Sequence, residues 1–598
     1  MALYQKHFIP CTLDGLPLKK QVSITSFSNR FSLKCKSWPV QCKLAAESQA
    51  IVRRSANYQP TIWDYSYIQS LTSEYQGEAY NRGATDLKEE VGMILEKSEG
   101  VAQLELIDNL QRLGLSYHFE DEIKIILSTI YDTRKRPLSQ FNAMINDADL
   151  HATALEFRLL RQQGYNVLPD VFNGFIDVNG KFKCSLCDDT EGILSLYEAS
   201  HLLVEGENIL EDARLFATKH LQEYAKQSSD NNAYLSSLVN HALELPLDWK
   251  IERAEARWFI DIYEKKIGMN PVFLQLAKLD FNLVQAKHQE DLKQASTWWV
   301  NTGLGKKLPF ARDRLMENFL WTVAVVPDPR FQHCRRAYTK LNTIITTIDD
   351  VYDIYGTLEE LELFTDAVER WDLNAMEQMP DYMKTCFLAL YNFVNEMSFD
   401  ALNKHGVYVI RLLRKAWADL CKSYLVEARW YYGKHTPPLQ EYMDNGWVSI
   451  AVPVVLVHAY FWVSDEVTLE ALQCLNQYPQ IIQWSSMIMR LANDLGTSPD
   501  ELKRGDISKS MQCYMNEKGA SEEEARQHIL HLISEAWEKV NRDRMADRSP
   551  FSKLFETTSI NLARMALCTY QDGDGFGSPD QETKDIILSL LVQPIPLK

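Results

Sequence analysis

The sequence of 598 residues is short of positive charge, glycine and proline. Lys and Arg number 63 against 81 Asp and Glu, which gives a net charge of -18. Without a basic footprint the chain is not expected to bind nucleic acid. Its 24 Gly and 21 Pro are few for an all-β chain of this size. It also lacks a Gly-rich phosphate loop, a Ser-His-Asp set and a dinucleotide fingerprint, which argues against nucleotide hydrolysis and hydride transfer.

Cysteine chemistry and a membrane span are also disfavoured. Cys184 and Cys187 form a lone CxxC without a second ligand pair at zinc spacing, so the eleven cysteines are interpreted as small buried hydrophobes in a reducing compartment. One stretch, 445–464, is long enough to span a bilayer. Pro453 and His458 interrupt it, and no Lys/Arg asymmetry flanks it. A buried core helix has the same hydropathy, so no membrane span is predicted.

The first part of the chain lacks acidic residues. Up to Ala46 it carries Asp14 as its one acid, among seven Lys and Arg and several serines. It has no continuous apolar run, which excludes a secretory signal and indicates an organelle transit peptide. We place this leader at residues 1–52 and predict a chloroplast or plastid location, although composition alone leaves a mitochondrial address or a plain tail open.

The remainder is predicted to be helical and to form two domains. Leu235, Leu238 and Val239 begin a helical apolar pattern that ends before Pro246. The chain is too long for one ordinary core. Asn270 and Pro271 are typical of a helix start, so we divide the chain into 53–268 and 269–598. Oligomeric state has no signature in the sequence.

The clearest chemical signal is the segment TTIDDVYD. At about 100° per residue, Asp349 and Asp353 share one helical face, whereas Asp350 points about a quarter-turn away. Apolar flanks indicate a buried helix, where unpaired carboxylates are costly. Paired carboxylate oxygens suit Mg²⁺ or Mn²⁺ completed by substrate phosphate. The alternative is a solvated helix face decorated with aspartates.

A second oxygen cluster lies in RLANDLGTSPDE. Asn493, Thr497 and Glu501 recur every four residues and share one face, with Arg490 leaning toward it. Helix capping would explain either Asn493 or Thr497 alone, but it does not explain the complete spacing.

A third element is the pair Arg312 and Arg314 in FARDRLMENFLW. Guanidinium groups offer bidentate recognition of a diphosphate, although a surface pair is the simpler alternative. Metal-binding oxygens together with arginines indicate a phosphate leaving group.

Taken together, these segments resemble the plant terpene synthase family from about Arg53 to the C-terminus. DDVYD is similar to its aspartate-rich motif, NDLGTSPDE to its second metal motif, RDR to its diphosphate-binding arginines, and RRSANYQPTIW to the tandem-arginine motif of its monoterpene branch. The resemblance implies an all-α fold, with an N-terminal degenerate α-barrel and a C-terminal class I helical bundle that carries out catalysis. No DxDD motif is present, so the class II protonation site is absent.

The resemblance also implies a set of site residues and a reaction. Three ions of Mg²⁺ or Mn²⁺ are assigned to Asp349, Asp353, Asn493, Thr497 and Glu501. Contacts with the substrate diphosphate are assigned to Arg312, Arg314, Arg490 and Lys509, together with Asp349, Asp353 and Asn493. Geranyl diphosphate would ionise, isomerise through linalyl diphosphate with the help of Arg53 and Arg54, and cyclise. An acyclic monoterpene, isoprene or sesquiterpene synthase is the enzyme alternative, and a noncatalytic helical scaffold is the alternative from another class.

Three residues are expected to meet the carbocation. Trp321 and Tyr570 are candidates for stabilising it with their aromatic faces, although each would also suit a core position. Asn342 lies seven residues before Asp349, and therefore on about the same face of the helix. It is either a core asparagine bonded to backbone or a residue that holds water, in which case products would include α-terpineol or 1,8-cineole.

Overall fold

The computed structural model describes residues 53–134, 149–227, 232–504, 508–546 and 548–597, with side chains described outside 499–504. The predicted transit peptide, 1–52, lies outside these ranges. Within them the structure is helical, and the β-type pairing is an isolated antiparallel bridge between Ile176 and Phe182. The all-α prediction is confirmed.

The N-terminal helices form where capping residues precede apolar stripes. Asn232 caps its helix by accepting a hydrogen bond from the Leu235 N–H, and Leu238, Val239 and Ala242 are buried on one face. This is the predicted pattern. The helices of this half are α1 (Tyr65–Ser70), α2 (Glu78–Lys97), α3 (Gly100–Arg112), α4 (Glu120–Arg134), α5 (Leu150–Gln162), α6 (Thr190–Ser200), α7 (Asn208–Gln227), α8 (Ala233–Glu244) and α9 (Glu252–Tyr263).

The remaining α-helices of the described chain lie in its C-terminal half, and several of them line the pocket described below. They are α10 (Pro271–Thr302), α11 (Leu304–Lys307), α12 (Leu315–Val325), α13 (Gln332–Asp350), α14 (Leu358–Arg370), α15 (Asp381–His405), α16 (Ile410–Gly433), α17 (Leu439–Ser449), α18 (Val452–Val463), α19 (Leu469–Asn476), α20 (Gln480–Arg504), α21 (Ser510–Lys518), α22 (Glu522–Arg544), α23 (Lys553–Tyr570) and α24 (Gln581–Leu591).

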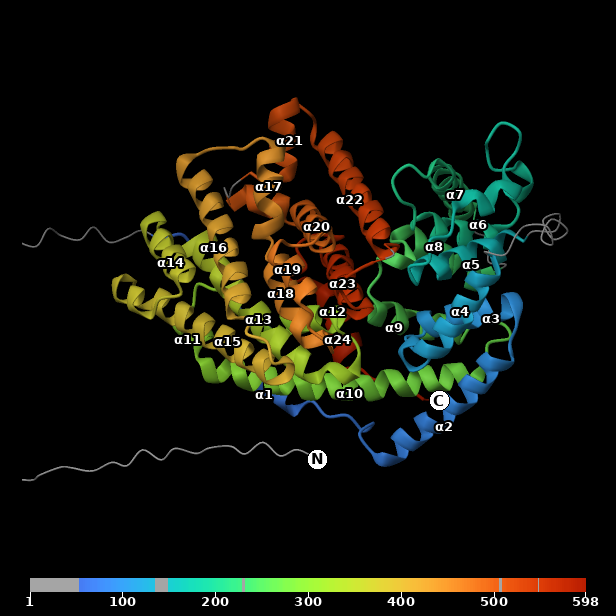
Figure 1. The fold of residues 1–598 in the computed structure, drawn as a ribbon, viewed down its shortest axis with the longest axis horizontal. Helices are drawn as coiled ribbons and strands as arrows, with labels where there is room; N and C mark the ends of the chain where they lie inside the picture. Colours follow the sequence, from blue (N-terminus) through green and yellow to red (C-terminus); the bar gives the residue numbers. More distant parts are fainter. Residues whose placement is uncertain (1–52, 135–148, 228–231, 505–507, 547, 598) are drawn as a thin grey trace, which may run out of the picture. The chain divides into compact units, whose positions relative to one another are not determined.

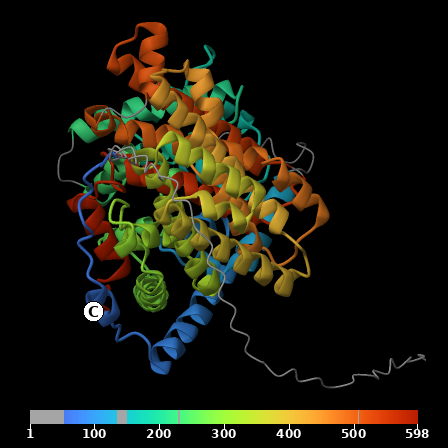
Figure 2. The same cartoon turned by 90° about the vertical axis from the view of Figure 1, so that its left-hand side faces the viewer.

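The long helix α10 borders both halves of the chain. It begins as predicted, with Asn270 accepting from the Val272 N–H at 2.9 Å and Pro271 in the first turn. It contacts α1, α2 and α9 as well as α12, α13 and α24. Figure 1 shows it running along the base of the helices, and Figure 2 shows it end on. The division near residue 269 coincides with its start and stays a prediction.

The apolar stretch around residue 450 is part of the core. Among the described residues, Leu439–Val463 is long and apolar enough to cross a membrane, and 83% of its apolar window is buried inside the fold. It consists of two helices, α17 and α18, separated where Ala451 adopts a φ of 66°. Because α18 packs against α13, α16, α20 and α23, it is a core helix, as predicted.

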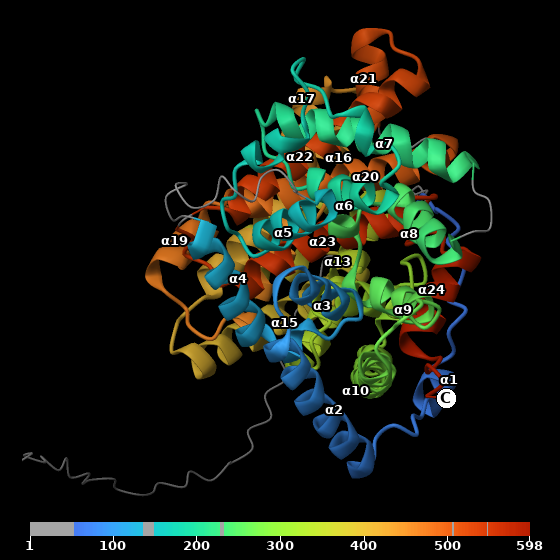
Figure 3. The same cartoon turned by 90° about the vertical axis from the view of Figure 1, so that its right-hand side faces the viewer.

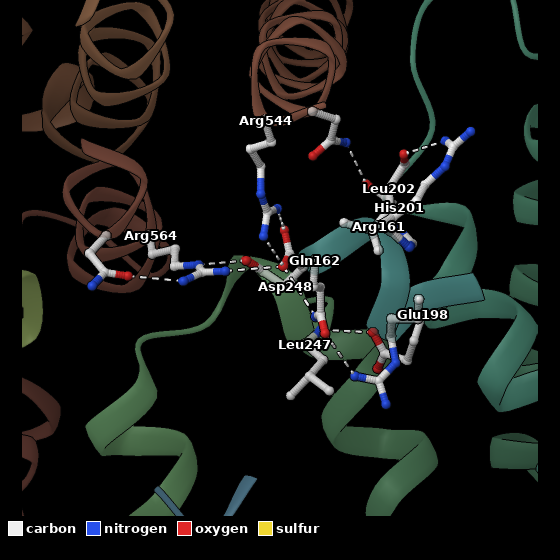
Figure 4. A network of polar contacts seen from close by, with 12 residues as sticks. Arg161, Gln162, Glu198, His201, Leu202, Leu247, Asp248, Arg544 and Arg564 are labelled. Carbon is white, nitrogen blue, oxygen red and sulfur yellow. Dashed lines mark hydrogen bonds and ion pairs between the residues drawn. The ribbon is translucent and has the colours of Figure 1, made fainter. Parts of the chain in front are cut away.

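A buried polar network joins the N-terminal helices to α22 and α23 (Figure 4). Asp248 lies in the short turn Leu247–Trp249, where its carboxylate accepts from Arg544 at 2.7 Å and from Arg564 at 3.1 Å. Gln162 of α5 donates to the same carboxylate at 3.3 Å. Figure 3 shows α5 among the neighbouring helices α3 to α8.

Candidate active site

The aspartate-rich segment lies where α13 ends in a π-helical turn, Val351–Tyr355. Asp349 and Asp353 both line a pocket of about 190 Å³. Asp350 is fully buried and is not part of the lining. The predicted offset between Asp350 and the other two aspartates is therefore present. The π-helical turn was not predicted; such turns are frequent at functional sites.

Asp350 anchors Arg312 beside the pocket. The Arg312 backbone N–H donates to Asp350 Oδ2 at 2.7 Å, and its Nε lies 2.9 Å from Asp350 Oδ1. Arg312 Nη2 also lies 2.5 Å from Asp349 Oδ2. Burial raises the pKa of Asp350 to about 6, although Arg312 opposes the rise. For Arg312 burial lowers the pKa, but Asp350, Tyr58 and Asp349 outweigh it, so the guanidinium stays charged.

The second cluster faces the same pocket from α20. Asn493, Thr497 and Arg490 line it, as the four-residue spacing predicts. Several groups hold Arg490: Nε donates to the Gly446 carbonyl at 3.1 Å, Nη2 to Ser449 Oγ at 3.0 Å, and Nη1 to Asn493 Oδ1 at 3.3 Å. Glu501 is within α20, but its side chain lies outside the described part of the chain.

Of the remaining basic candidates, Lys509 lines the pocket and Arg314 does not. Arg314 is buried, and its Nη atoms donate at 3.1 Å to the carbonyls of Gln59, Asp313 and Gly577. This placement does not support its predicted contact with a diphosphate. It ties the segment before α1 to the loop after α23 instead.

The tandem arginines lie against the segment that carries Asp353. Arg54 lines the pocket and donates to the Asp353 carbonyl at 2.7 Å. Arg53 does not line it; its guanidinium pairs with Glu360 at 2.8 Å and donates to the Tyr355 carbonyl at 2.8 Å. Both residues are thus placed to hold the described segment before α1 against the pocket.

The pocket also contains the predicted aromatic residues and the asparagine. Trp321 and Tyr570 line it, with their ring centroids 6.2 Å apart. Asn342 lines it from α13, half-buried, about 10 Å along the helix axis from Asp349. Phe576 and Tyr338 add aromatic surface that the sequence did not single out. The pocket therefore combines charged groups with apolar walls.

Several lining residues were missed by the sequence analysis. Glu427 and Tyr424 enter from α16, and Tyr58 from the segment before α1. Glu427 is buried and accepts hydrogen bonds from Ser449 and Asn445. A glutamate inside the apolar run SYLVEARW was the available signal, because buried carboxylates are rare without partners.

The donor set fits hard divalent cations. The Thr497 hydroxyl is buried in the pocket wall and has no hydrogen-bond partner among the described residues. Beside it, Asn493 contributes an amide oxygen, and Asp349 and Asp353 contribute carboxylates. Oxygen ligands of these kinds suit Mg²⁺ or Mn²⁺.

Comparison with known proteins places these features in a family. Residues 62–243 match the model "Terpene synthase, N-terminal domain", and residues 300–539 match "Terpene synthase family, metal binding domain". The chain is 59% identical to a chloroplastic myrcene synthase of Quercus ilex, over 94% of this chain and 93% of the relative. It is 58% identical to a (-)-alpha-terpineol synthase of Vitis vinifera, over 94% and 95% of the two chains.

Solved structures agree with these matches. A limonene synthase with 2-fluorolinalyl diphosphate superposes with a TM-score of 0.88 at 47% identity, covering 91% of this chain and all of that one. An isoprene synthase from grey poplar leaves, in complex with three Mg²⁺ ions and dimethylallyl-S-thiolodiphosphate, superposes with a TM-score of 0.81 at 46% identity, covering 90% and 99%. Because both family models match in order and the relatives align over nearly their full lengths, the chain belongs to the plant terpene synthase family and is a lyase that acts on diphosphates.

Proposed function

We propose that this chain is a plastid monoterpene synthase that ionises geranyl diphosphate and cyclises the resulting cation. The observation that carries the proposal is the pocket, in which four predicted oxygen ligands and three predicted basic residues share one lining with Trp321, Tyr570 and Asn342. The oxygen ligands are Asp349, Asp353, Asn493 and Thr497, and the basic residues are Arg312, Arg490 and Lys509. Plastid location is supported by the acid-poor leader and by the chloroplastic myrcene synthase among the relatives.

Residues that would hold divalent cations are those predicted from the two motifs. They are Asp349, Asp353, Asn493, Thr497 and Glu501. Three Mg²⁺ ions, or Mn²⁺ in their place, would supply Lewis-acid neutralisation of the charge that develops on the departing diphosphate. The isoprene synthase complex, with its three Mg²⁺ ions, supports this number.

Basic residues of the chain bind and orient the diphosphate. Arg490 and Lys509 are both almost fully buried in the pocket wall, where their charges are screened less than at a surface. Arg312 is paired with Asp349 in this structure, so its contact with the diphosphate requires that pair to open. Arg54 and its neighbour Arg53 hold the N-terminal segment over the pocket and thereby exclude water during isomerisation.

The apolar part of the pocket controls the fate of the cation. Trp321 and Tyr570 present aromatic faces that stabilise positive charge without attacking it. The Asn342 side chain faces the pocket and makes no hydrogen bond to another described residue, which favours the water-holding role over a core asparagine bonded to backbone. Water captured there would yield α-terpineol or 1,8-cineole beside hydrocarbons.

An acyclic product is the second candidate. It is favoured by the myrcene synthase relative, which is as similar to this chain as the terpineol synthase is. The two candidates differ after ionisation, since both require the same departure of diphosphate.

The test is the product profile from geranyl diphosphate and Mg²⁺, measured by gas chromatography and mass spectrometry. We expect the wild type to make cyclic alcohols or ethers and Asn342→Ile to make hydrocarbons alone. Thr347→Val is the matched control, because Thr347 is buried on the same helix, outside the lining, and should leave the ratio unchanged. A wild type that makes only hydrocarbons would defeat the water-holding role. Turnover of farnesyl diphosphate in preference to geranyl diphosphate would defeat the monoterpene assignment.

A further inference from the structure

Helix α20 presents a second stripe of polar residues beside the one that lines the pocket. Asp494 directly follows Asn493, and Ser498 directly follows Thr497. The pair therefore repeats the four-residue spacing of the two lining residues. Both are buried, at 0% and 4% exposure, but neither is part of the lining. A step of about 100° turns them away from the pocket. They face the start of α21 instead.

This second stripe holds the N-terminal backbone of α21. Asp494 Oδ2 accepts from the Ser510 N–H at 3.1 Å. Gln512 bridges the two helices: its Oε1 accepts from the Lys509 N–H at 3.1 Å, and its Nε2 donates to Ser498 Oγ. Two amides that a helix start leaves without partners are thereby satisfied, one by α20 directly and one through a side chain held by α20.

The same aspartate also reaches Arg490. Its Oδ1 accepts from Arg490 Nη1 at 3.4 Å and from the Tyr442 hydroxyl at 3.0 Å. One buried carboxylate therefore connects Arg490 with the backbone next to Lys509, and both of these cations line the pocket.

We propose that Asp494 and Ser498 are positioning residues, which hold the start of α21 so that Lys509 meets the substrate diphosphate together with Arg490. The inference rests on the proposed diphosphate role of these two cations. A lysine ammonium is a point charge on a flexible stem, so the position of its backbone decides where the charge can reach. Fixing residues 509 and 510 before substrate arrives reduces the ordering that binding would otherwise require.

The test is a double-mutant cycle between Ser498 and Lys509. Pyrophosphate in Mg²⁺ buffer is the probe, and its dissociation constant is measured by isothermal titration calorimetry. Loss of one neutral hydrogen bond predicts a rise of about threefold to tenfold for Ser498→Ala. In a Lys509→Ala background the same substitution should add nothing, because the residue it positions is gone. Ser498→Thr keeps the hydroxyl and should restore tight binding.

A matched control separates positioning from loss of packing. Ser486 is fully buried on the same helix, and its hydroxyl donates to the Ile482 carbonyl at 2.6 Å, away from α21. Ser486→Ala should leave the dissociation constant unchanged. Circular dichroism confirms folding of each variant. Gln512→Ala, which removes the bridge from the other side, provides a second route to the same result if Ser498→Ala folds poorly.

The outcomes are distinguishable. Two results would overturn the positioning inference while the diphosphate role of Lys509 stands. In the first, Lys509→Ala weakens pyrophosphate binding but Ser498→Ala and Gln512→Ala do not. In the second, the losses caused by Ser498→Ala or Gln512→Ala add to the loss caused by Lys509→Ala. If Lys509→Ala leaves binding unchanged, the diphosphate role fails and the inference fails with it. The positioning inference is supported if Ser498→Ala and Gln512→Ala weaken pyrophosphate binding equally, and if neither weakens it further in the Lys509→Ala background.

Discussion

Replacing Asp248 by alanine should weaken the attachment of the N-terminal helices to α22 and α23. The carboxylate is buried and pairs with Arg544 and Arg564, whose side chains are about one-tenth exposed (Figure 4). Removing one partner of a buried pair typically costs about 3 to 5 kcal/mol. Arg564 keeps its hydrogen bonds to the backbone carbonyl of residue 248 and to Asn561, so we expect the lower end, about 3 kcal/mol.

A local fluorescence signal makes this measurable. Trp249, next to Asp248, stacks on Trp537 of α22 with ring centroids 5.3 Å apart. Urea unfolding followed by tryptophan fluorescence and by circular dichroism should show an earlier transition in Asp248→Ala. Asp261→Ala removes an exposed pair with Arg257 and should shift stability by less than about 0.5 kcal/mol. A shift below about 1 kcal/mol in Asp248→Ala would refute the reasoning.

Acid should remove the same stabilisation. Burial raises the pKa of Asp248, but Arg544 and Arg564 outweigh it, so the pKa lies below its ordinary value. The stabilisation is therefore complete above the ordinary pKa of about 4 and is lost as the pH falls through the folded value. Asp248→Asn has no carboxylate at this position, so its free energy of unfolding should fall less on acidification than that of the wild type. Activity of the folded variants should persist, because residue 248 is not part of the pocket lining.

Three further results are expected. Asp349→Ala or Glu501→Ala should abolish pyrophosphate release while circular dichroism is retained, and near-normal release from either folded variant would contradict the metal assignment. Chelation of divalent cations with EDTA should stop turnover reversibly; persistent activity after dialysis against EDTA would contradict metal dependence. A chain that begins at Arg53 should keep the wild-type products. A chain that begins at Ser55 loses the contacts of both arginines with the turn Val351–Tyr355 and should make fewer cyclic products. Identical product spectra would contradict the tandem-arginine role.

Helix positions and the two oxygen stripes were predictable from the sequence because both depend on short-range periodicity. A four-residue spacing places Asn493 and Thr497 on one face wherever the helix lies, and Asn270 with Pro271 starts a helix by local backbone chemistry. The same helical geometry turns Asp350 away from the face that Asp349 and Asp353 share.

Contacts that depend on distant segments were not predictable. Arg312 and Arg314 lie in a stretch without helical period, so the sequence could not tell which of them faces the pocket. The structure decides it through Asp350, which holds Arg312, and through carbonyls far along the chain, which hold Arg314. Glu427 was missed because its carboxylate is brought to the pocket by packing of α16.

The residues that line this pocket differ in how firmly their neighbours hold them. The groups proposed to act on the diphosphate are each held by neighbours: Arg312 by Asp350, and Arg490 by Gly446 and Ser449. Asn342 makes no such side-chain bond among the described residues. A substitution there therefore disturbs little beyond the pocket wall. If Asn342 directs the fate of the cation as proposed, its side chain can change while the groups proposed to act on the diphosphate stay the same. Such a change is compatible with the names of an acyclic and a cyclic product that two relatives of nearly equal identity to the chain bear.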